Sequence, residues 1–178
     1  MENNIEKVLI SEEALAKRVE ALGKQITEEY KEEELLVIGI LKGSNIFMSD
    51  LVRKINLPLK MDFMVVSSYG NATQSTGVVK ILKDVEESIK GKHVLIVEDL
   101  IDTGLTLKYL KEMLLTREPR SIRICTLLEK PARRQEAVDV DFVGFEVPDE
   151  FIIGYGIDYA EQYRNLPYVG ILKREVYE

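Results

Sequence analysis

The sequence predicts a single α/β domain in which helices cover both faces of a parallel β-sheet. Its 178 residues are the usual size of one domain, and 46% of them are apolar, which is enough for a substantial core. Short apolar runs alternate with segments whose apolar residues recur at helical spacing. This alternation is typical of βαβ units, whose crossovers place helices on the faces of the sheet. The sequence contains no internal repeat and no linker that would divide the chain.

The first elements follow from local chemistry. Ser11 precedes Glu12 and Glu13, which predicts a helix start, because the hydroxyl caps free N–H groups and the carboxylates lie at the positive end of the helix dipole. Residues 35–41 (LLVIGIL) are a short apolar run, typical of a strand buried on both faces. Residues 42–55 predict a glycine turn that leads into a helix.

The second half of the chain continues the alternation. Strands are predicted at 61–69, 78–82, 93–97, 121–130 and 140–147, with a helix at about 103–115. The segment 70–77 (GNATQSTG) is small and polar apart from Ala72, so we expect a mobile loop between two strands.

Composition and charge argue against several classes of protein. A net charge of −7 and a pI near 5.0 disfavour a dominant nucleic-acid or membrane surface, because both need clustered Lys and Arg. The one cysteine, Cys125, lies in an apolar stretch, so we expect a buried thiol and no intrachain disulfide. The first twenty residues lack the apolar run of a signal peptide, and every apolar run is far shorter than the roughly 20 residues of a membrane span. We therefore expect a cytoplasmic protein.

Three carboxylates, Glu98, Asp99 and Asp102, follow the apolar run 93–97 (HVLIV). In open α/β sheets, ligands bind beyond the carboxyl ends of the strands. The free N–H groups of residues 102–106, at the start of the predicted helix, form a cradle for a phosphate monoester. Carboxylates repel phosphate, so they need sugar hydroxyls or a bridging Mg²⁺ as partners. The pattern predicts a sugar-phosphate ligand, and the alternative is that the two aspartates cap the helix while Glu98 faces solvent.

The same segment resembles a known motif. VLIVEDLIDTGLTL (94–107) is similar to the phosphoribosyl-pyrophosphate binding motif of type I phosphoribosyltransferases, apolar residues followed by E-D-x-x-D-T-G-x-T. LKGS (41–44), SSYGNATQSTG (67–77), LLEKPARR (127–134) and the segment 149–172 resemble, in order, the 6-oxopurine members of that family, the hypoxanthine-guanine phosphoribosyltransferases. The resemblance covers nearly the whole chain.

The resemblance implies a fold and a reaction. The fold is a mostly parallel twisted sheet flanked by helices, with a core of about 12–145 and a small hood, from about 1–11 and 146–178, over the carboxyl ends of the strands. The reaction is a purine-salvage transfer of phosphoribose from 5-phosphoribosyl 1-pyrophosphate to N9 of hypoxanthine or guanine, with Mg²⁺ as cofactor, giving IMP or GMP and pyrophosphate. The expected partners are these small molecules and further copies of the chain in a homodimer or homotetramer, without nucleic acid or membrane.

The resemblance assigns the phosphoribosyl pyrophosphate site to Leu41, Lys42, Gly43, Ser68, Tyr69, Glu98, Asp99, Asp102, Thr103, Gly104, Leu105, Thr106 and Arg164. Lys42 and Arg164 address the pyrophosphate, and the family carries a non-proline cis peptide bond before this lysine. Residues 103–106 cradle the 5′-phosphate. Position 105 is often lysine in relatives and is leucine here, which leaves only its backbone amide as a donor. The loop 68–77 closes over the site and excludes water, with Ser68 and Tyr69 reaching the pyrophosphate.

The resemblance also implies the catalytic, purine and metal residues. Asp102 faces the purine N7 and is the general base. The purine site comprises Lys130, Phe151, Ile152 and Asp158. In this site Lys130 donates to the exocyclic O6, Phe151 stacks on the base and Ile152 offers backbone contacts. Glu98 and Asp99 address the ribose hydroxyls directly or through Mg²⁺, and the metal ligands are Glu98, Asp99 and Asp158.

Two alternative functions stay open at this stage. One is a regulatory RNA-binding protein that keeps the phosphoribose site as a sensor, against which the acidic pI and the purine-site residues Lys130 and Phe151 weigh. The other is an enzyme that favours xanthine, because discrimination at C2 of the purine depends on backbone placement near Ile152 and Asp158.

Overall fold

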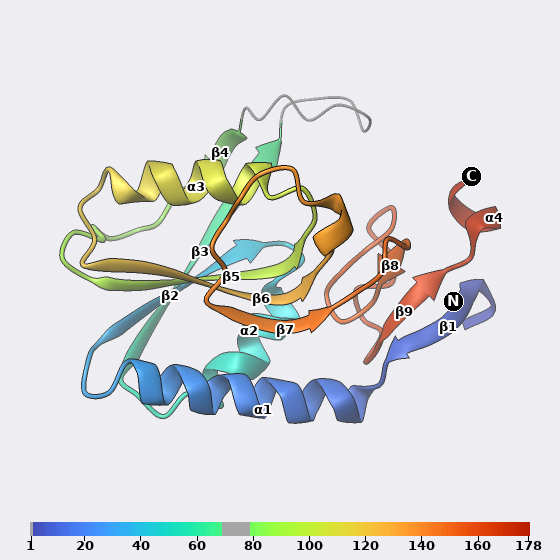
Figure 1. The fold of residues 1–178 in the computed structure, drawn as a ribbon, viewed down its shortest axis with the longest axis horizontal. Helices are drawn as coiled ribbons and strands as arrows, with labels where there is room; N and C mark the ends of the chain where they lie inside the picture. The colour runs from blue at the N-terminus through green and yellow to red at the C-terminus, as the bar shows by residue number, and fades with distance from the viewer. Residues whose placement is uncertain (1, 69–78) are drawn as a thin grey trace.

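A six-stranded sheet forms the centre of the computed structural model, which describes residues 2–68 and 79–178 (Figure 1). The strand order is β4-β3-β2-β5-β6-β7. Neighbouring strands are parallel except β3 and β4, which are antiparallel. The strands are β2 (Leu35–Leu41), β3 (Leu59–Ser68), β4 (Val79–Lys83), β5 (His93–Ile101), β6 (Ser121–Glu129) and β7 (Phe142–Glu146). The prediction of a mostly parallel sheet is confirmed.

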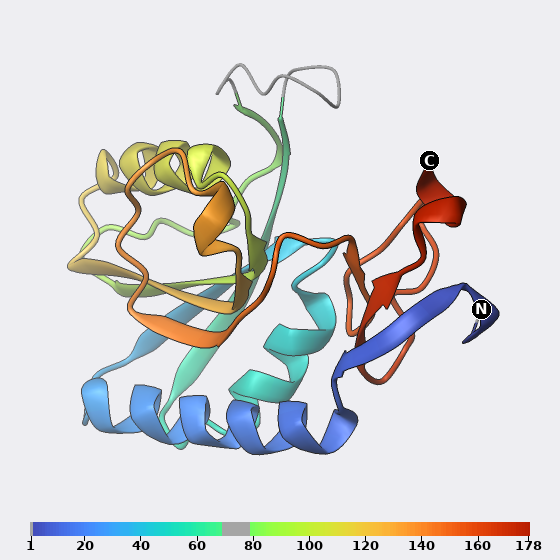
Figure 2. The same cartoon turned by 45° about the vertical axis from the view of Figure 1, so that its right-hand side comes forward.

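Helices cover both faces of this sheet (Figures 1 and 2). On one face lie α1 (Glu12–Glu29) and α2 (Asn45–Val52), and on the other lies α3 (Leu105–Leu115). Ser11 caps α1 as predicted, because its Oγ accepts a hydrogen bond from the amide of Ala14 at 3.2 Å. Each face has its own buried apolar cluster, and six of the seven β2 residues are buried. The continuous apolar run at 35–41 therefore follows from burial on both faces.

A second, three-stranded sheet lies to one side of the first (Figures 1 and 2). It is antiparallel, in the order β1-β9-β8, and is built from β1 (Ile5–Ile10), β8 (Ile152–Ile153) and β9 (Val169–Leu172). Its neighbours are the 3₁₀-helix η1 (Glu2–Asn4) and the short helix α4 (Arg174–Tyr177), and the amide of Lys173 donates to the carbonyl of Asn4 at 2.9 Å. The first and last segments of the chain thus meet in one sheet, while the boundaries of a core at about 12–145 and a hood stay a prediction.

The strand predicted at 93–97 is longer in the structure. The ladder between β5 and β6 continues through Glu98, Leu100 and Ile101, because Ile101 is buried and its neighbour Leu100 packs against the core. Glu98 and Asp99 therefore belong to the end of a strand instead of a turn. The helix predicted within 42–55 is confirmed but shorter. Tyr69 and the loop predicted at 70–77 lie outside the described residues.

An ion pair joins the end of β4 to the end of α3. The guanidinium of Arg117 donates to both carboxylate oxygens of Asp84, at 2.8 and 2.7 Å. These hydrogen bonds lower the pKa of Asp84 below its usual 3.8. A carboxyl whose pKa is depressed by folding stabilises the native state above its unfolded pKa, and this contribution is lost as the pH falls through the native pKa.

We expect Asp84→Asn to lower the free energy of unfolding by about 0.5 kcal/mol at pH 7, a small value because the pair is partly exposed and screened by water. The difference from the unmodified protein should shrink as the pH falls below 3.8. Urea unfolding at pH 7 and pH 3 measures it, with Glu112→Gln on the exposed surface of α3 as the control. A difference that grows toward low pH would contradict the assignment.

The remaining expectations from composition concern the thiol and the membrane. Cys125 is fully buried, and burial raises the pKa of its thiol well above the usual range, so it behaves as a small apolar side chain. Within residues 2–68 and 79–178, no helix is both long enough and apolar enough to cross a membrane.

Candidate active site

The predicted site residues lie at one edge of the main sheet. Strands β2, β5 and β6 are parallel, so their carboxyl ends share an edge, and the segments 42–44, 102–104 and 130–134 follow these ends. Two cavities open there, a cleft of about 580 Å³ and a smaller cavity of about 120 Å³. Both have the side chains of Leu100 and Asp102 in their walls, so the two cavities meet at Asp102.

The larger cleft brings together five residues that were predicted to surround a purine. Asp102, Lys130, Phe151, Ile152 and Asp158 all line it. They come from the end of β5, the end of β6 and the segment that carries β8, which are far apart in the sequence. The structure therefore places these five residues in one space large enough for a base.

The smaller cavity is built on the amino-terminal end of α3. Thr103, Gly104 and Thr106 line it together with Glu98, and Gly104 adopts a left-handed conformation with φ 84°. The N-cap residue, Gly104, has no side chain to cap the first turn of α3, so its backbone N–H groups meet no acceptor from that residue. The amide of Leu105 lies 3.4 Å from Thr103 Oγ1. This arrangement provides the donors for a phosphate group, and Leu105 contributes through its amide alone.

Two adjacent carboxylates lie at the end of β5. Burial, together with the charge of Asp99, raises the pKa of Glu98 well above its usual range. Asp99 Oδ1 accepts from the amide of Leu100 at 2.8 Å, and the amide of Asp99 lies 3.2 Å from Glu98 Oε1. Among the described residues, no lysine or arginine side chain forms an ion pair with either carboxylate. The pair therefore lowers its electrostatic energy when a cation binds between or beside the two groups.

The carboxylate of Asp102 has one close cationic neighbour. Arg133, in the 3₁₀-helix η2 (Pro131–Arg133), places its Nε 2.8 Å from Asp102 Oδ1. The angle at the donor is not that of a hydrogen bond, and Oδ1 is buried without a hydrogen-bond partner among the described residues. Arg133 therefore holds one oxygen of Asp102, whose partly exposed carboxylate lines both cavities. Arg133 was not among the predicted site residues, although it lies within the quoted segment LLEKPARR.

Lys130 is a buried cation in the cleft. It is 8% exposed, and its Nζ donates to the carbonyl of Glu150 at 2.7 Å and lies 4.0 Å from Asp149 Oδ1. Burial lowers the pKa of Lys130, and the carboxylates of Asp102 and Asp149 oppose that shift. The ammonium is thus a positioned donor with hydrogen atoms to spare for a ligand.

Phe151 belongs to an aromatic group. Its ring packs edge to face on Tyr159, with centroids 5.4 Å apart, and stacks on Tyr177 at 4.5 Å with an angle of 26° between the ring planes. Tyr177 also lines the cleft. One face of Phe151 is therefore covered by the chain itself, and a base must use the other face or displace Tyr177. No pattern in the sequence pointed to Tyr177, because its contact with Phe151 arises only in the folded chain.

The segment 41–44 lies against the carboxylate pair. The Leu41–Lys42 peptide bond is cis, as the family resemblance implied. A Cβ atom added to Gly43 would lie 1.7 Å from Asp99 Oδ2, and one added to Gly156 would lie 2.2 Å from the carbonyl oxygen of Gly43. Only glycine allows the three segments to approach so closely. The turn after β2 therefore lies between Asp99 and the segment that carries Asp158, close to both.

We expect Gly43→Ala to reduce activity strongly, because the new methyl group overlaps the Asp99 carboxylate and must displace it or the turn. Displacement of a positioned catalytic group by about 1 Å lowers the reaction rate on the order of 10²-fold. Turnover measured beside a thermal melt separates lost activity from lost folding. Glu112→Ala serves as the control, since Glu112 lies on the exposed surface of α3 and lines neither cavity. Unchanged turnover in Gly43→Ala would show that this contact has no role.

The cations predicted for pyrophosphate lie on the other side of this turn. Lys42 Nζ is 2.8 Å from Glu161 Oε2, and Arg164 Nη2 is 3.3 Å from Glu161 Oε1. Arg164 also lies 3.0 Å from Asp158 Oδ1 and donates to the carbonyl of Gly156 at 2.8 Å. Hydrogen bonding with Lys42 lowers the pKa of Glu161. A chain of ion pairs thus connects Lys42 with Asp158 in the cleft.

The predicted metal ligands are divided between two places. Glu98 lines the smaller cavity and Asp158 the larger, and within the part of the chain that the structure describes no three acidic, histidine or cysteine side chains form a metal-binding group. Mg²⁺ is usually held by one or two carboxylates plus water and substrate phosphates, so the pair Glu98 and Asp99 suits it without a third protein ligand. The assignment of Asp158 to metal stays a prediction.

Two predicted residues lie at the border of the described part of the chain. Ser68 ends β3, where its backbone pairs with that of Val79. Tyr69 is outside the described residues, so the closing loop is not tested.

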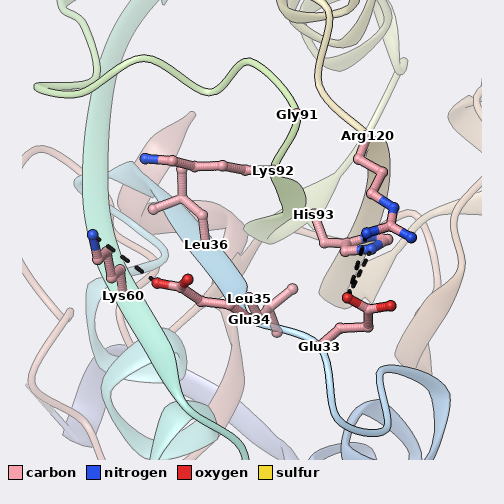
Figure 3. Close-up of a pocket in the computed structure, with 9 residues that line it drawn as sticks. All are labelled: Glu33, Glu34, Leu35, Leu36, Lys60, Gly91, Lys92, His93 and Arg120. Carbon is pink, nitrogen blue, oxygen red and sulfur yellow. Dashed lines mark ion pairs between the residues drawn. The ribbon is translucent and has the colours of Figure 1, made fainter.

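Another cavity, of about 190 Å³, lies at the opposite edge of the main sheet (Figure 3). It is lined where β2, β3 and β5 begin, and none of the predicted site residues contributes to it. Its charges pair with one another: His93 Nε2 and Arg120 Nη1 lie 3.7 and 3.6 Å from Glu33 Oε2, and Lys60 faces Glu34 at 4.0 Å. His93 Nδ1 is 2.6 Å from Ser121 Oγ, which connects the ring to the neighbouring strand β6.

Comparison with known proteins identifies what this arrangement is similar to. Residues 8–160 match the family model described as "Phosphoribosyl transferase domain". A hypoxanthine-guanine phosphoribosyltransferase of Bacillus subtilis is 57% identical over 178 residues, which are 100% of this chain and 99% of that protein.

Solved structures of phosphoribosyltransferases are similar to this chain as well. A hypoxanthine phosphoribosyltransferase from Staphylococcus aureus superimposes with a TM-score of 0.98 at 50% identity, covering 100% of this chain and 97% of that one. A hypoxanthine-guanine phosphoribosyltransferase from Bacillus anthracis superimposes with a TM-score of 0.92 at 49% identity, covering 95% and 99% of the two chains. Sequence and fold are therefore similar over the full length.

Proposed function

Because the chain belongs to the phosphoribosyl transferase domain family, we propose that its two adjoining cavities bind a 6-oxopurine and a sugar phosphate. The protein is an enzyme that transfers phosphoribose to hypoxanthine and guanine, in agreement with the names of the hypoxanthine-guanine phosphoribosyltransferases that share 51–57% of its residues over nearly their full length. The products are IMP or GMP and pyrophosphate. The RNA-binding alternative is not favoured by any observation at the site.

The position of Asp102 is the single observation that supports this proposal best. Its carboxylate is part of the wall of both cavities, one suited to a base and one suited to a phosphate. A transferase must join a base to C1 of a sugar whose 5′-phosphate lies a sugar's length away, so a carboxylate at the junction is next to the reacting atoms. The side chain of Asp102 is 42% exposed, so its carboxylate can accept the purine N7 proton while N9 attacks C1, and Arg133 lies 2.8 Å from its buried Oδ1.

The other residues bind and orient the substrates. The amides and hydroxyls at the start of α3 hold the 5′-phosphate, and Lys42 and Arg164 hold the pyrophosphate. Glu98 and Asp99 hold the ribose hydroxyls and, with Asp158, the Mg²⁺. When bound, Mg²⁺ supplies positive charge that neutralises the leaving pyrophosphate.

Lys130 sets the preference for 6-oxopurines in this proposal. Its ammonium can donate to O6 of hypoxanthine or guanine and cannot accept from the 6-amino group of adenine. A bound adenine would leave the buried donor unpaired beside another donor, which costs binding energy. Contacts to the pyrimidine edge come from the backbone near Ile152, so guanine and xanthine are distinguished there.

The experiment that tests the function measures pyrophosphate release by the purified protein with Mg²⁺ and 5-phosphoribosyl 1-pyrophosphate. Hypoxanthine, guanine, xanthine and adenine are supplied in separate reactions. We expect turnover with hypoxanthine and guanine and none above background with adenine. Xanthine turnover equal to that of guanine would favour the xanthine alternative. RNA binding that weakens with salt, without turnover of any base, would reject the enzyme.

The location and assembly of the enzyme are part of the same proposal. We propose a cytoplasmic enzyme, with direct access to purine bases and phosphoribosyl pyrophosphate, that assembles as a homodimer or homotetramer, as the family resemblance implies. Size-exclusion chromatography with light scattering measures the assembly, and a monomer at micromolar concentration would contradict it.

A further inference from the structure

The carboxylate of Glu161 joins the two cations assigned to pyrophosphate. Its Oε2 lies 2.8 Å from Lys42 Nζ, and its Oε1 lies 3.3 Å from Arg164 Nη2. The two cations come from the turn after β2 and from the segment before β9, which are separated by most of the chain. One carboxylate therefore spans both cations with a different oxygen on each, as a phosphoryl group would do.

The backbone directs Glu161 toward these cations. Its amide donates to Asp158 Oδ2 at 2.9 Å, and its φ of 63° lies in the left-handed region, as does the φ of 49° at Ala160. A non-glycine residue adopts this conformation rarely, so the surrounding turn holds it there. The placement of the carboxylate is thus determined by the fold of residues 158–164.

The two cations depend on Glu161 to different degrees. Arg164 has two further partners, Asp158 Oδ1 at 3.0 Å and the carbonyl of Gly156 at 2.8 Å, and it remains placed without Glu161. For Lys42, Glu161 is the side-chain partner that the described part of the chain provides. Lys42 and Glu161 are 67% and 64% exposed at their side chains, so their contact breaks at little cost when a stronger anion arrives.

We propose that Glu161 is a positioning residue, an internal counter-anion that neutralises Lys42 and Arg164 in the empty site and is displaced by pyrophosphate. This inference rests on the proposed function, because it takes Lys42 and Arg164 as the pyrophosphate cations. Before binding, the carboxylate holds the two positive groups near each other despite their repulsion. During binding it competes with the ligand, and after transfer it competes again, which favours release of the product.

The charge of Glu161 therefore weakens pyrophosphate binding. Glu161→Gln removes the charge and keeps the size of the side chain. The competing anion lies 2.8 and 3.3 Å from two partly solvated cations, so its loss is expected to tighten the binding of inorganic pyrophosphate about three- to tenfold. Damage to the fold does not tighten binding, so the direction of the effect distinguishes this role from a structural one.

The test is isothermal titration calorimetry of the full chain with inorganic pyrophosphate at fixed Mg²⁺, beside steady-state kinetics. We expect Glu161→Gln to lower the Kd for pyrophosphate and the KM for 5-phosphoribosyl 1-pyrophosphate together, with the KM for hypoxanthine unchanged. Glu161→Asp keeps the charge and should stay within about twofold of the unmodified protein.

Glu118→Gln is the matched control. Glu118 forms a similarly exposed ion pair with Lys90 at 2.6 Å. The two residues lie in the segments before β6 and β5, which carry none of the predicted site residues. Glu118→Gln changes the net charge by the same amount as Glu161→Gln. We expect no change of pyrophosphate affinity in this variant. An unchanged or higher Kd in Glu161→Gln would overturn the inference, as would equal tightening in Glu118→Gln. Failure of the unmodified protein to bind pyrophosphate would instead overturn the proposed function.

Discussion

Replacing Asp102 with asparagine is expected to lower kcat by about 10²–10⁴-fold, the usual contribution of a general base. Asparagine keeps the size and one acceptor of the side chain but cannot take the purine N7 proton. Because the phosphate cavity is formed by the first turn of α3, the Kd for 5-phosphoribosyl 1-pyrophosphate should change little. The large loss is therefore confined to the chemical step.

Single-turnover kinetics with hypoxanthine measure the chemical step, and calorimetry measures substrate binding. Asp139→Asn makes the same chemical change at an exposed position that lines neither cavity, and it should leave both quantities unchanged. If Asp102→Asn had a normal kcat, Asp102 would have no part in proton transfer. A loss of phosphoribosyl pyrophosphate binding of similar size would show that Asp102 supports the site instead of the reaction.

Replacing Lys130 with alanine is the second change for which we expect a large effect. A hydrogen bond to a charged group contributes about 1.5–3 kcal/mol, so the KM for hypoxanthine should rise about 10- to 150-fold. The Kd for 5-phosphoribosyl 1-pyrophosphate should change much less, because Lys130 lines the purine cleft and not the phosphate cavity. Discrimination against adenine should weaken in the same variant, since the donor that rejects the 6-amino group is gone.

Lys130 also donates to the carbonyl of Glu150, so its replacement removes a contact within the fold as well as the ligand contact. Lys130→Met keeps most of the aliphatic stem, so it separates loss of the ammonium from loss of side-chain packing. A similar purine KM in both variants, with normal thermal melts, would assign the loss to the missing ammonium. Equal weakening of purine and phosphoribosyl pyrophosphate binding would refute the contact with O6.

Local sequence determines much of the main sheet. The run 35–41 corresponds to β2 residue for residue, because a strand buried on both faces needs a continuous apolar run. Ser11 caps α1 as predicted, because the free N–H groups of a first helical turn favour a serine at that position. The end of β5 was missed because carboxylates interrupt its apolar pattern, although pairing with β6 continues past them. Strand β1 escaped prediction since it pairs with β9, at the far end of the chain, and most of its residues are at least partly exposed.

The site residues also divide into those that a local motif identifies and those whose role depends on contacts across the fold. The E-D-x-x-D-T-G-x-T segment could be identified because its residues are adjacent in sequence and act together. Arg133, Glu161 and Tyr177 could not, since each gains its significance from a contact across the fold, with Asp102, with two cations, or with the ring of Phe151. The roles carried over from the family resemblance are arranged compatibly around the cleft and stay predictions until the variants are measured.

The small sheet that joins the first and last segments also sets an order of events during protein synthesis. Strand β1 leaves the ribosome early, but its neighbour β9 is made only near the end of translation. The purine wall around Phe151 and Ile152 is connected to β9 through β8, so it is completed after the main sheet has all its strands. A nascent chain therefore acquires its phosphate cradle first and its base specificity last, and local opening of the small sheet in the finished protein disturbs the purine wall while the cradle on α3 stays formed.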